Sequence, residues 1–298
     1  MQIITQLPTY NPVIMEHLPP IFSGRAGQVI TGLQLIVVAS SYANEKNPET
    51  RAQYSKFSQT VDLTKKTSSS SPPATWSSKL AMFVIYFPAL VASTILLVLG
   101  SSGNELLLFS APAPSVASYC CIIHFLKRVL ETLFLHKYSG RTDVGTPTMI
   151  SIYYTLTATL VAYGAGMGAP LTTGLFDGTY DIRDMLGVTV FLIGIIGNFY
   201  HHFLLAKLRS GKQAKSVAAY VAPKGGLFNY VAAPHYFFEL LGWAGIAVAS
   251  NQLNVYLVMA GMTSYLAGRS VAQNDWNRAR FKEKDWPKDR KNLVPFIF

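Results

Sequence analysis

The stretch GNFYHHFLLAKLRSGKQAKSVAAYVAPKGGLFNYVAAPHYFFELLGW (residues 197–243) decides the fold, because it reads as an apolar helix, a basic loop and a second apolar helix. In the first helix, Asn198, His202, Leu205 and Arg209 are spaced four, three and four residues apart and therefore share one face. The other polar residues of the stretch include Lys207, Lys212, Lys215, Tyr220, Lys224, His235, Tyr236 and Glu239. A polar stripe beside a cationic, glycine-containing loop predicts an entry point for an anionic cofactor at a membrane.

Long apolar runs occupy most of the remaining chain. Half of the residues are apolar and 13% are charged. A helix needs about 20 residues to cross a hydrocarbon core of about 30 Å. Each backbone polar group in lipid must also find its hydrogen-bond partner within the protein, as it does in a helix. The runs long enough are residues 24–43, 78–101, 105–136, 147–172, 183–206, 228–250 and 252–272. The sequence therefore predicts an all-α, polytopic membrane protein with a bundle of about seven transmembrane helices.

The placement of the basic residues along the chain explains the net charge of +10. With seven spans, alternate connections share a side of the membrane. One side receives Lys46, Arg51, Lys56, Lys65, Lys66, Lys137, Arg141, the loop 207–224 and the tail 278–291. The opposite side carries Asp177, Asp181 and Asp184 against Arg183. Because cytosolic loops are enriched in Lys and Arg, we expect a cytosolic C-terminus and no nucleic-acid partner.

Three regions are expected along the chain. Residues 1–23 form a lumenal lead without a recognisable signal peptide, so the first span serves as the insertion signal. Residues 24–146 form an N-terminal transmembrane region with a flexible, serine-rich cytosolic loop at 44–78, and residues 147–298 form the C-terminal domain with its basic tail. The adjacent Cys120 and Cys121 lie in an apolar run, which predicts buried thiols.

A charged stripe crosses the third predicted span. His124, Lys127, Arg128 and Glu131 lie at positions i, i+3, i+4 and i+7 and share a helix face. Charges at that depth in a membrane are costly. Either Lys127 and Arg128 do no more than pair with Glu131, or the whole stripe lines a wet functional cavity. In the second span, Tyr86 precedes a kink-forming proline and is either a packing residue or part of that cavity.

Recognisable catalytic motifs of other classes are missing from the sequence. There is no metal-ligand spacing, because His201 and His202 are neighbours on a helix and no HExxH occurs. We therefore predict no metal site. Without Gly-x-Ser-x-Gly or a Walker loop, neither serine hydrolysis nor phosphoryl transfer is expected.

Several pieces near the C-terminus form one joint pattern. They are residues 197–209, YVAPKGGLFNYV (220–231), PHYFFE (234–239), Trp243, Arg269 and WPKDRKNLVPFIF (286–298). This pattern resembles the steroid 5-alpha-reductase superfamily, identified by its 3-oxo-5-alpha-steroid 4-dehydrogenase C-terminal domain. The superfamily also contains very-long-chain trans-2-enoyl-CoA reductases and polyprenol reductases.

The resemblance implies a reductase of the endoplasmic reticulum membrane, with residues 147–298 as its reductase domain. It would take NADPH from the cytosol and reduce a conjugated C=C bond in a lipid, either a trans-2-enoyl-CoA of very-long-chain fatty acid elongation or a 3-oxo-Δ4 steroid. Association with other lipid-synthesis enzymes is also expected. The segment HFLKRVLETLFLHK (124–137) is similar to the enoyl-CoA reductases, whereas steroid reductases place a tyrosine at Phe125.

The same resemblance assigns expected roles to individual residues. Tyr236 would act as the acid beside Lys127, with His124 and Tyr86 as further catalytic residues. The expected cofactor-binding residues are Asn198, His202, Arg209, Tyr220, His235, Glu239, Arg128 and Asn277. The chain departs from the family pattern in three places, where His202 replaces an aspartate, Asn277 a tyrosine, and the second-span acid near Tyr86 is missing.

Other functions remain open at this point. Polyprenol reduction fits the Pro-His-Tyr motif at 234–236. A membrane methyltransferase dependent on S-adenosylmethionine would use a similar cytosolic pocket. A non-catalytic sterol-binding or lipid-binding protein fits the missing second-span carboxylate. A seven-helix receptor is disfavoured because few polar groups face the outer side.

Overall fold

The structure, a computed structural model, shows a mostly helical chain. The described residues are 19–52, 57, 74–101, 105–106, 109–110, 114–138, 140–168, 182–209 and 221–298. The helices are α2 (Gly24–Lys46), α3 (Ser78–Ser101), α4 (Val116–Leu130), η2 (a π-helix, Glu131–Leu135), α5 (Gly145–Gly168), α6 (Ile182–Leu208), η4 (a 3₁₀-helix, Gly226–Asn229), α7 (Pro234–Ser250) and α8 (Leu253–Arg280). Tyr220 and most of the predicted lead and loop lie outside the described residues.

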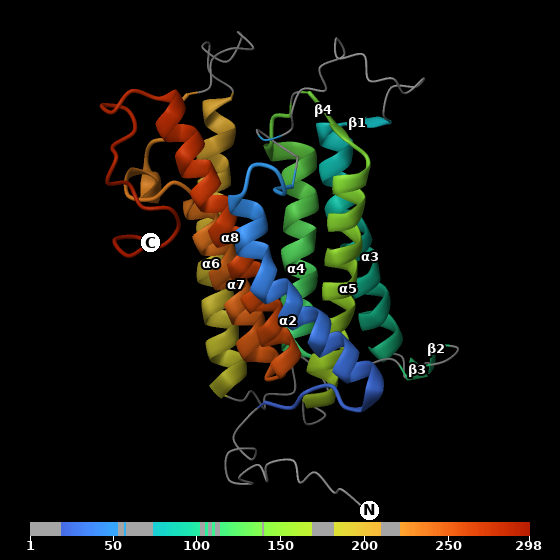
Figure 1. Ribbon diagram of the computed structural model, residues 1–298. Helices are drawn as coiled ribbons and strands as arrows, with labels where there is room; N and C mark the ends of the chain where they lie inside the picture. The colour runs from blue at the N-terminus through green and yellow to red at the C-terminus, as the bar shows by residue number, and fades with distance from the viewer. Residues whose placement is uncertain are drawn as a thin grey trace, which may run out of the picture.

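Long helices lie side by side in one bundle (Figure 1). The most extensive packing joins α6 to α7, α2 to α8, and α3 to α5. Two short antiparallel strand pairs lie at opposite ends of the bundle, β1 (Thr75–Ser77) with β4 (Arg141–Asp143) and β2 (Glu105–Leu106) with β3 (Phe109–Ser110). α4, α6 and α8 all end on the side of the β1–β4 pair (Figure 1), where the last turns of α6 and α8 carry basic residues.

Three of the described helices, α2, α3 and α6, are long and apolar enough to cross a membrane. Their large apolar side chains point outward in many places, since Leu33, Ile36 and Ile196 are 59%, 62% and 65% exposed. An outward apolar surface on a long helix is the arrangement expected for a helix that is surrounded by lipid. The helical, membrane-protein part of the prediction is therefore supported.

The predicted spans are wrong at three boundaries. The third helix begins at Val116 and not at 105, because Ser115 caps it by accepting a hydrogen bond from the Ser118 amide. The helix expected from 228 begins at Pro234, since proline fits the first turn and the η4 turn precedes it. The last helix continues beyond 272 to Arg280, because Gln273, Asn274 and Asn277 are buried there and Asn274 donates hydrogen bonds to Arg290 and Asn292 of the tail.

Glycines allow α6 and α7 to approach closely. A β-carbon at Gly187 would lie 2.7 Å from the backbone nitrogen of Ala249. A β-carbon at Gly194 would collide with the backbone of Gly242, and one at Gly245 with the backbone of Phe191. Small residues at contacts between apolar helices allow such backbone contact, and van der Waals packing then stabilises the pair.

We expect Gly194→Val to destabilise the protein by about 1–3 kcal/mol, because the added carbons force α6 and α7 apart. The measurement is the unfolding transition of the purified protein in detergent. Gly32→Val is the matched control, since a β-carbon at this α2 position meets no atom within 4 Å. Equal stability of the two variants would contradict the packing described for α6 and α7.

An apolar core lies between α3, α4, α5, α6, α7 and α8. Its fully buried members include Phe125, Phe191 and Trp243. Cys120 and Cys121 belong to the same core and are free thiols, which confirms the prediction for them. This core closes one side of the polar cluster described below.

The C-terminal tail folds back onto the segment that leads into α7. The Ala232 amide donates to the Lys291 carbonyl at 2.8 Å, and the Lys291 amide donates to the Tyr230 carbonyl at 3.0 Å. The indole of Trp286 donates to Asn274 of α8 at 2.8 Å. The tail is therefore held between the end of α8 and the start of α7.

A buried ion pair joins α2 to α8. Arg269 is 1% exposed and donates from Nη1 to Oε2 of Glu45 at 2.8 Å and to the carbonyl of Ala52 at 2.9 Å. A buried pair with these additional bonds fixes the relative position of the first and last described helices.

Candidate active site

A polar network forms at the end of α4, where the helix passes into the π-helix η2. Lys127 Nζ lies 2.8 Å from Oε1 of Glu131, and Arg128 Nη1 lies 2.7 Å from Oε2 of the same carboxylate. The spacing of three and four residues places these groups on one helix face, as the sequence predicted. Glu131 is 3% exposed, so both ion pairs are largely shielded from water.

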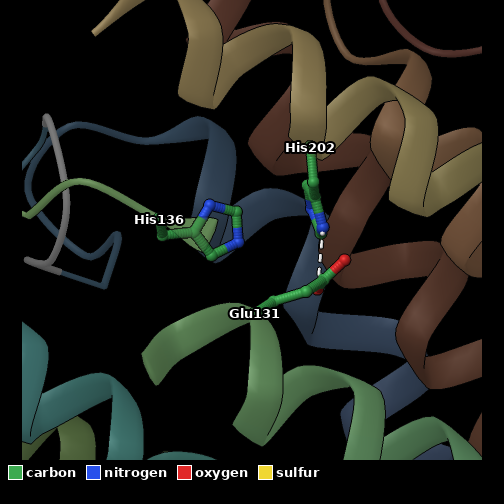
Figure 2. Close-up of side chains that lie close together, drawn as sticks. All are labelled: Glu131, His136 and His202. Carbon is green, nitrogen blue, oxygen red and sulfur yellow. Dashed lines mark hydrogen bonds and ion pairs between the residues drawn. The ribbon is translucent and has the colours of Figure 1, made fainter. Parts of the chain in front are cut away.

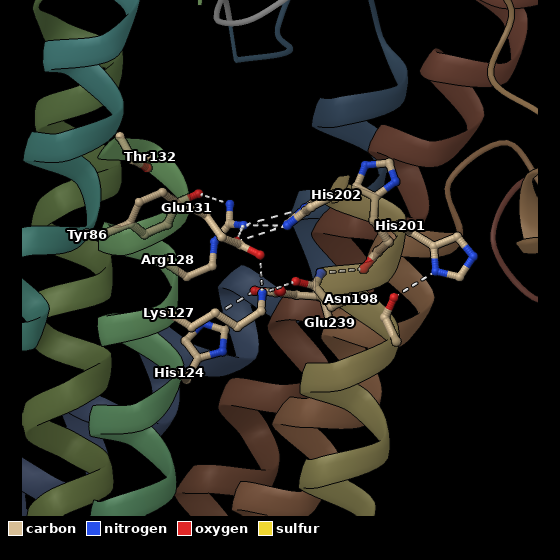
Figure 3. A network of polar contacts seen from close by, with 12 residues as sticks. Tyr86, His124, Lys127, Arg128, Glu131, Thr132, Asn198, His201, His202 and Glu239 are labelled. Carbon is tan, nitrogen blue, oxygen red and sulfur yellow. Dashed lines mark hydrogen bonds and ion pairs between the residues drawn. The ribbon is translucent and has the colours of Figure 1, made fainter. Parts of the chain in front are cut away.

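Three other helices contribute to this network (Figure 3). Arg128 Nη2 donates to the hydroxyl of Tyr86 on α3, and Lys127 donates to Oδ1 of Asn198 on α6. Asn198 then donates from Nδ2 to the carbonyl of His235 on α7 at 2.8 Å. The network therefore ties α3, α4, α6 and α7 together, and the pairing within α4 is only one part of it.

His202 joins the network from α6, one helical turn after Asn198. Its Nδ1 lies 3.0 Å from Oε2 of Glu131 and 3.0 Å from Nη1 of Arg128. The resemblance leads one to expect an aspartate at position 202 of α6. Here position 202 is a histidine, and the carboxylate beside it belongs to Glu131 (Figure 2).

A second carboxylate lies on α7. Oε1 of Glu239 is 3.4 Å from Nε2 of His124, whose ring centroid is 5.0 Å from that of Trp243. Phe125, the next residue on α4, is fully buried against Tyr154 and Trp243. The polar network is therefore bordered by aromatic side chains that keep water away.

The charges of the network nearly balance. The two cations Lys127 and Arg128 face the two carboxylates Glu131 and Glu239. Burying such groups is costly, and the cost falls when every charge has a hydrogen-bonded partner. Two adjacent cations held by a shared carboxylate can stabilise negative charge that develops on a bound molecule, and such stabilisation is strong in a dry site.

Most predicted site residues meet in this network. Those in direct contact within it are Tyr86, His124, Lys127, Arg128, Asn198, His202 and Glu239. Tyr236 lies in the first turn of α7, and its ring centroid is 4.2 Å from that of His235, whose carbonyl accepts the bond from Asn198. The His235 ring in turn lies 5.6 Å from that of His202.

Two predicted cofactor residues lie away from these contacts. Arg209 is at the end of α6, is exposed, and donates from Nη1 to the carbonyl of Lys137 at 2.6 Å. Asn277 is buried on α8, on the side of the C-terminal tail. Tyr220 falls outside the described residues, so the structure does not place it.

Sequence reasoning missed two residues. Glu131 was recognised as a pairing partner of Lys127 or Arg128, but not as the group that also holds His202. The second is Arg290, whose guanidinium lies 3.9 Å above the ring of Trp286 and is buried, while Nε and Nη1 have no hydrogen-bond partner among the described residues. Burial lowers the pKa of Arg290 below its ordinary value. The sequence alone did not single out Arg290, because the expected cytosolic position of the tail already explains every basic residue in it.

The chain is similar in sequence to known enzymes. Residues 148–298, just over half of the chain, match the family model for 3-oxo-5-alpha-steroid 4-dehydrogenase. A very-long-chain enoyl-CoA reductase of Dictyostelium discoideum is 29% identical over 187 residues, which are 62% of this chain and 58% of that protein. A probable very-long-chain enoyl-CoA reductase of Caenorhabditis elegans is 30% identical over 193 residues, which are 62% of this chain and 59% of that protein.

The steroid enzymes match a shorter region. The human 3-oxo-5-alpha-steroid 4-dehydrogenase 1 is 33% identical over 122 residues, covering 41% of this chain and 45% of the human protein. The chain thus spans about half the length of the curated relatives it matches. The matches confirm the resemblance inferred from residues 197–298. The chain belongs to the 3-oxo-5-alpha-steroid 4-dehydrogenase family.

Proposed function

We propose that this chain is a membrane-embedded, NADPH-dependent reductase of a conjugated C=C bond in a lipid. The observation that carries the proposal is the buried pair of cations, Lys127 and Arg128, which share Glu131 inside an otherwise apolar bundle. The names of its relatives support a lipid reductase. We further propose seven membrane spans in the endoplasmic reticulum, with the C-terminus and the ends of α4, α6 and α8 on the cytosolic side.

The first substrate candidate is a trans-2-enoyl-CoA. Phe125 is fully buried and offers no hydroxyl at the position where the steroid enzymes are expected to carry a carbonyl-binding tyrosine. The charged stripe of α4 also follows the pattern expected of the enoyl-CoA reductases. A 3-oxo-Δ4 steroid is the second candidate, because several relatives carry the name of steroid enzymes.

NADPH fits the residues that are present. Its phosphates need cationic donors, and Arg290 offers two buried guanidinium nitrogens without a partner among the described residues. The tail places Arg290 beside the segment that leads into His235 and Tyr236. Residues proposed to hold the cofactor are Asn198, His202, Arg209, Tyr220, His235, Glu239, Arg128, Asn277 and Arg290. When bound, NADPH supplies the hydride for the β-carbon of the substrate.

The residues of the network have separate proposed tasks. Lys127 and Arg128 stabilise the negative charge that develops on the carbonyl oxygen of the substrate. Glu131 keeps the two cations side by side. Tyr236 donates a proton to the α-carbon or the oxygen, and the apolar walls around Phe125 exclude water.

Tyr236→Phe is expected to reduce turnover by at least about 100-fold while leaving NADPH affinity nearly unchanged, because it removes only the proposed acid. Turnover is followed by NADPH consumption, and affinity by fluorescence titration. Tyr230→Phe is the matched control, since this tyrosine is exposed in the preceding turn. Loss of affinity together with turnover would refute the acid role and assign Tyr236 to cofactor binding.

One parallel assay tests the proposed function. The purified protein is incubated with NADPH and, separately, with a trans-2-enoyl-CoA, a 3-oxo-Δ4 steroid and a polyprenal. We expect the enoyl-CoA to be reduced fastest. Binding of S-adenosylmethionine with no binding of NADPH would contradict the proposal and favour a methyltransferase. Lipid binding without NADPH oxidation in any assay would favour a non-catalytic protein.

A further inference from the structure

Residues 294–298 form a closed loop with apolar side chains on its outside. The amides of Leu293 and Val294 both donate to the Phe298 carbonyl, at 2.8 and 2.9 Å, and the Phe298 amide donates to the Val294 carbonyl at 3.1 Å. Phe296 and Ile297 lie within this loop and are 75% and 78% exposed. The backbone bonds therefore hold two large apolar side chains away from the protein core.

Phe296 also has a backbone conformation that few side chains adopt. Its φ is 67°, in the left-handed region, which is disfavoured for residues with a β-carbon. Its ring centroid lies 5.3 Å from that of Tyr230, which is itself 49% exposed. A strained and exposed phenylalanine gains little from the described part of the protein, so a compensating contact is expected from outside the chain.

The loop continues the outward apolar face of α6. Ile196 and Tyr200 are one helical turn apart on that face, and both are exposed. A β-carbon at Gly226 of η4 would lie 2.9 Å from the Tyr200 ring, so η4 packs directly against this part of α6. Tyr230 follows η4 and contacts Phe296. The surface of α6 that is expected to face lipid is thus continuous with the loop.

The position of this contact along α6 sets the depth of the loop. The Leu227 amide donates to Nε2 of His201 at 3.1 Å, and His201 lies two turns, or about 10 Å, before the end of α6 at Leu208. A helix of 27 residues is about 40 Å long, whereas the hydrocarbon core measures about 30 Å. In Figure 1 the C-terminus likewise lies partway along the bundle, short of the ends of α6 and α8. The loop therefore lies near the boundary between acyl chains and headgroups.

We propose that Tyr230 and residues 294–298 form a docking surface for the lipid of the cytosolic leaflet, into which Phe296 and Ile297 insert. Aromatic side chains near exposed cations are typical of the membrane interface, and the same tail exposes Lys282, Lys284, Lys288 and Lys291. A stable protein partner usually takes about 800 Å² from each side, more than these few side chains offer. The lipid contact rests on the part of the proposed function in which α6 crosses the membrane, and it does not depend on reductase activity.

Insertion of the loop also supports the segment that leads into α7. The Lys291 amide donates to the Tyr230 carbonyl at 3.0 Å, and the Ala232 amide donates to the Lys291 carbonyl at 2.8 Å. The tail and this segment are therefore joined on both sides of Lys291. Lipid that holds the loop thereby holds the segment just before His235.

The test uses nitroxide labels on the full-length protein in phosphatidylcholine vesicles. One label is placed at Ile297→Cys, a lipid-facing reference at Ile196→Cys and a water-facing reference at Lys282→Cys. Wild type treated in the same way gives the background, which is low because Cys120 and Cys121 are buried. Relaxation by oxygen is compared with relaxation by a water-soluble nickel complex. We expect this ratio at position 297 to be at least about threefold that at 282 and to approach that at 196.

Each other outcome of the labelling identifies what fails. A water-like ratio at 297 with a lipid-like ratio at 196 would overturn the lipid contact and leave the membrane crossing of α6 intact. Water-like ratios at both positions would refute that crossing and the proposed function with it. Magnetic broadening between labels at 297 would show that a second copy covers the loop. Low access of both reagents there would show that protein covers it, and either result overturns the proposal.

A variant of Phe296 tests which side chain inserts. Phe296→Ser is expected to lower the ratio at position 297 at least about twofold, because it removes the larger of the two apolar side chains, whereas Phe296→Trp should preserve it. Glu283→Ser is the matched control, since Glu283 is exposed in the same tail outside the loop. The ratio at position 196 must stay constant, which shows that the bundle is still folded. An unchanged ratio at 297 in Phe296→Ser would overturn the insertion of Phe296.

Discussion

Glu131→Gln is expected to give the largest loss of stability of any single substitution in the network. The change removes one negative charge and leaves Lys127 and Arg128 adjacent, buried and without their shared carboxylate. Breaking a buried ion pair from one side costs about 3–5 kcal/mol, because the remaining charge is uncompensated. We expect unfolding in detergent to shift accordingly, and turnover to fall because the two cations repel each other and separate.

Two further variants control this experiment. Glu49→Gln removes an exposed carboxylate and should leave both unfolding and turnover unchanged. Glu131→Asp retains the charge on a shorter side chain and should recover most of the stability but only part of the activity. Unchanged stability and activity in Glu131→Gln would show that the carboxylate does not hold the network together.

Lys127→Met is expected to lower turnover by about 10²–10³-fold, which is the usual effect of removing one donor that stabilises a developing negative charge. Methionine preserves most of the length and apolar volume of the side chain, so packing along α4 is retained. The ammonium lost is the one that bonds to Asn198 and pairs with Glu131. Single-turnover and steady-state measurements of NADPH consumption give the size of the effect.

An exposed lysine provides the comparison for Lys127. Lys79 bonds to the carbonyl of Leu133 at the surface, and Lys79→Met should leave turnover within about twofold of wild type, because exposed contacts contribute little. If Lys127→Met changed the apparent affinity for the substrate without changing turnover, Lys127 would be a ground-state binding residue. That result would contradict its proposed role in stabilising charge.

The sequence predicted the mostly helical class of the fold, but not the ends of its helices. Long apolar runs indicate helices, because apolar side chains are favoured on a helix both where it contacts lipid and where it contacts the protein core. The ends depend on local capping, as at Ser115 and Pro234, and on polar residues buried by distant parts of the chain, as at Asn274. The close approach of α6 and α7 was also missed, because glycine spacing alone does not show which helix lies opposite.

The sequence predicted only part of the candidate site, because it shows which residues share a helix face but not which helices pack together. Positions i, i+3, i+4 and i+7 on α4 follow from helical geometry, so the charged stripe could be recognised in the sequence. Its partners could not, because Asn198 and His202 are 71 and 74 residues from Lys127 and Arg128 and contact them only through packing. The π-turn at Glu131 was hidden as well, since apolar periodicity does not distinguish it from an α-helix.

Transfer of a deuteride tests the central claim most directly. The purified protein is given NADPH deuterated at the nicotinamide C4 position together with a trans-2-enoyl-CoA, and the product is analysed by mass spectrometry. We predict a saturated acyl-CoA that carries deuterium at its β-carbon, formed by wild type and nearly absent with Lys127→Met. An unreduced substrate and unoxidised NADPH with every lipid offered, from a folded protein, would contradict the account.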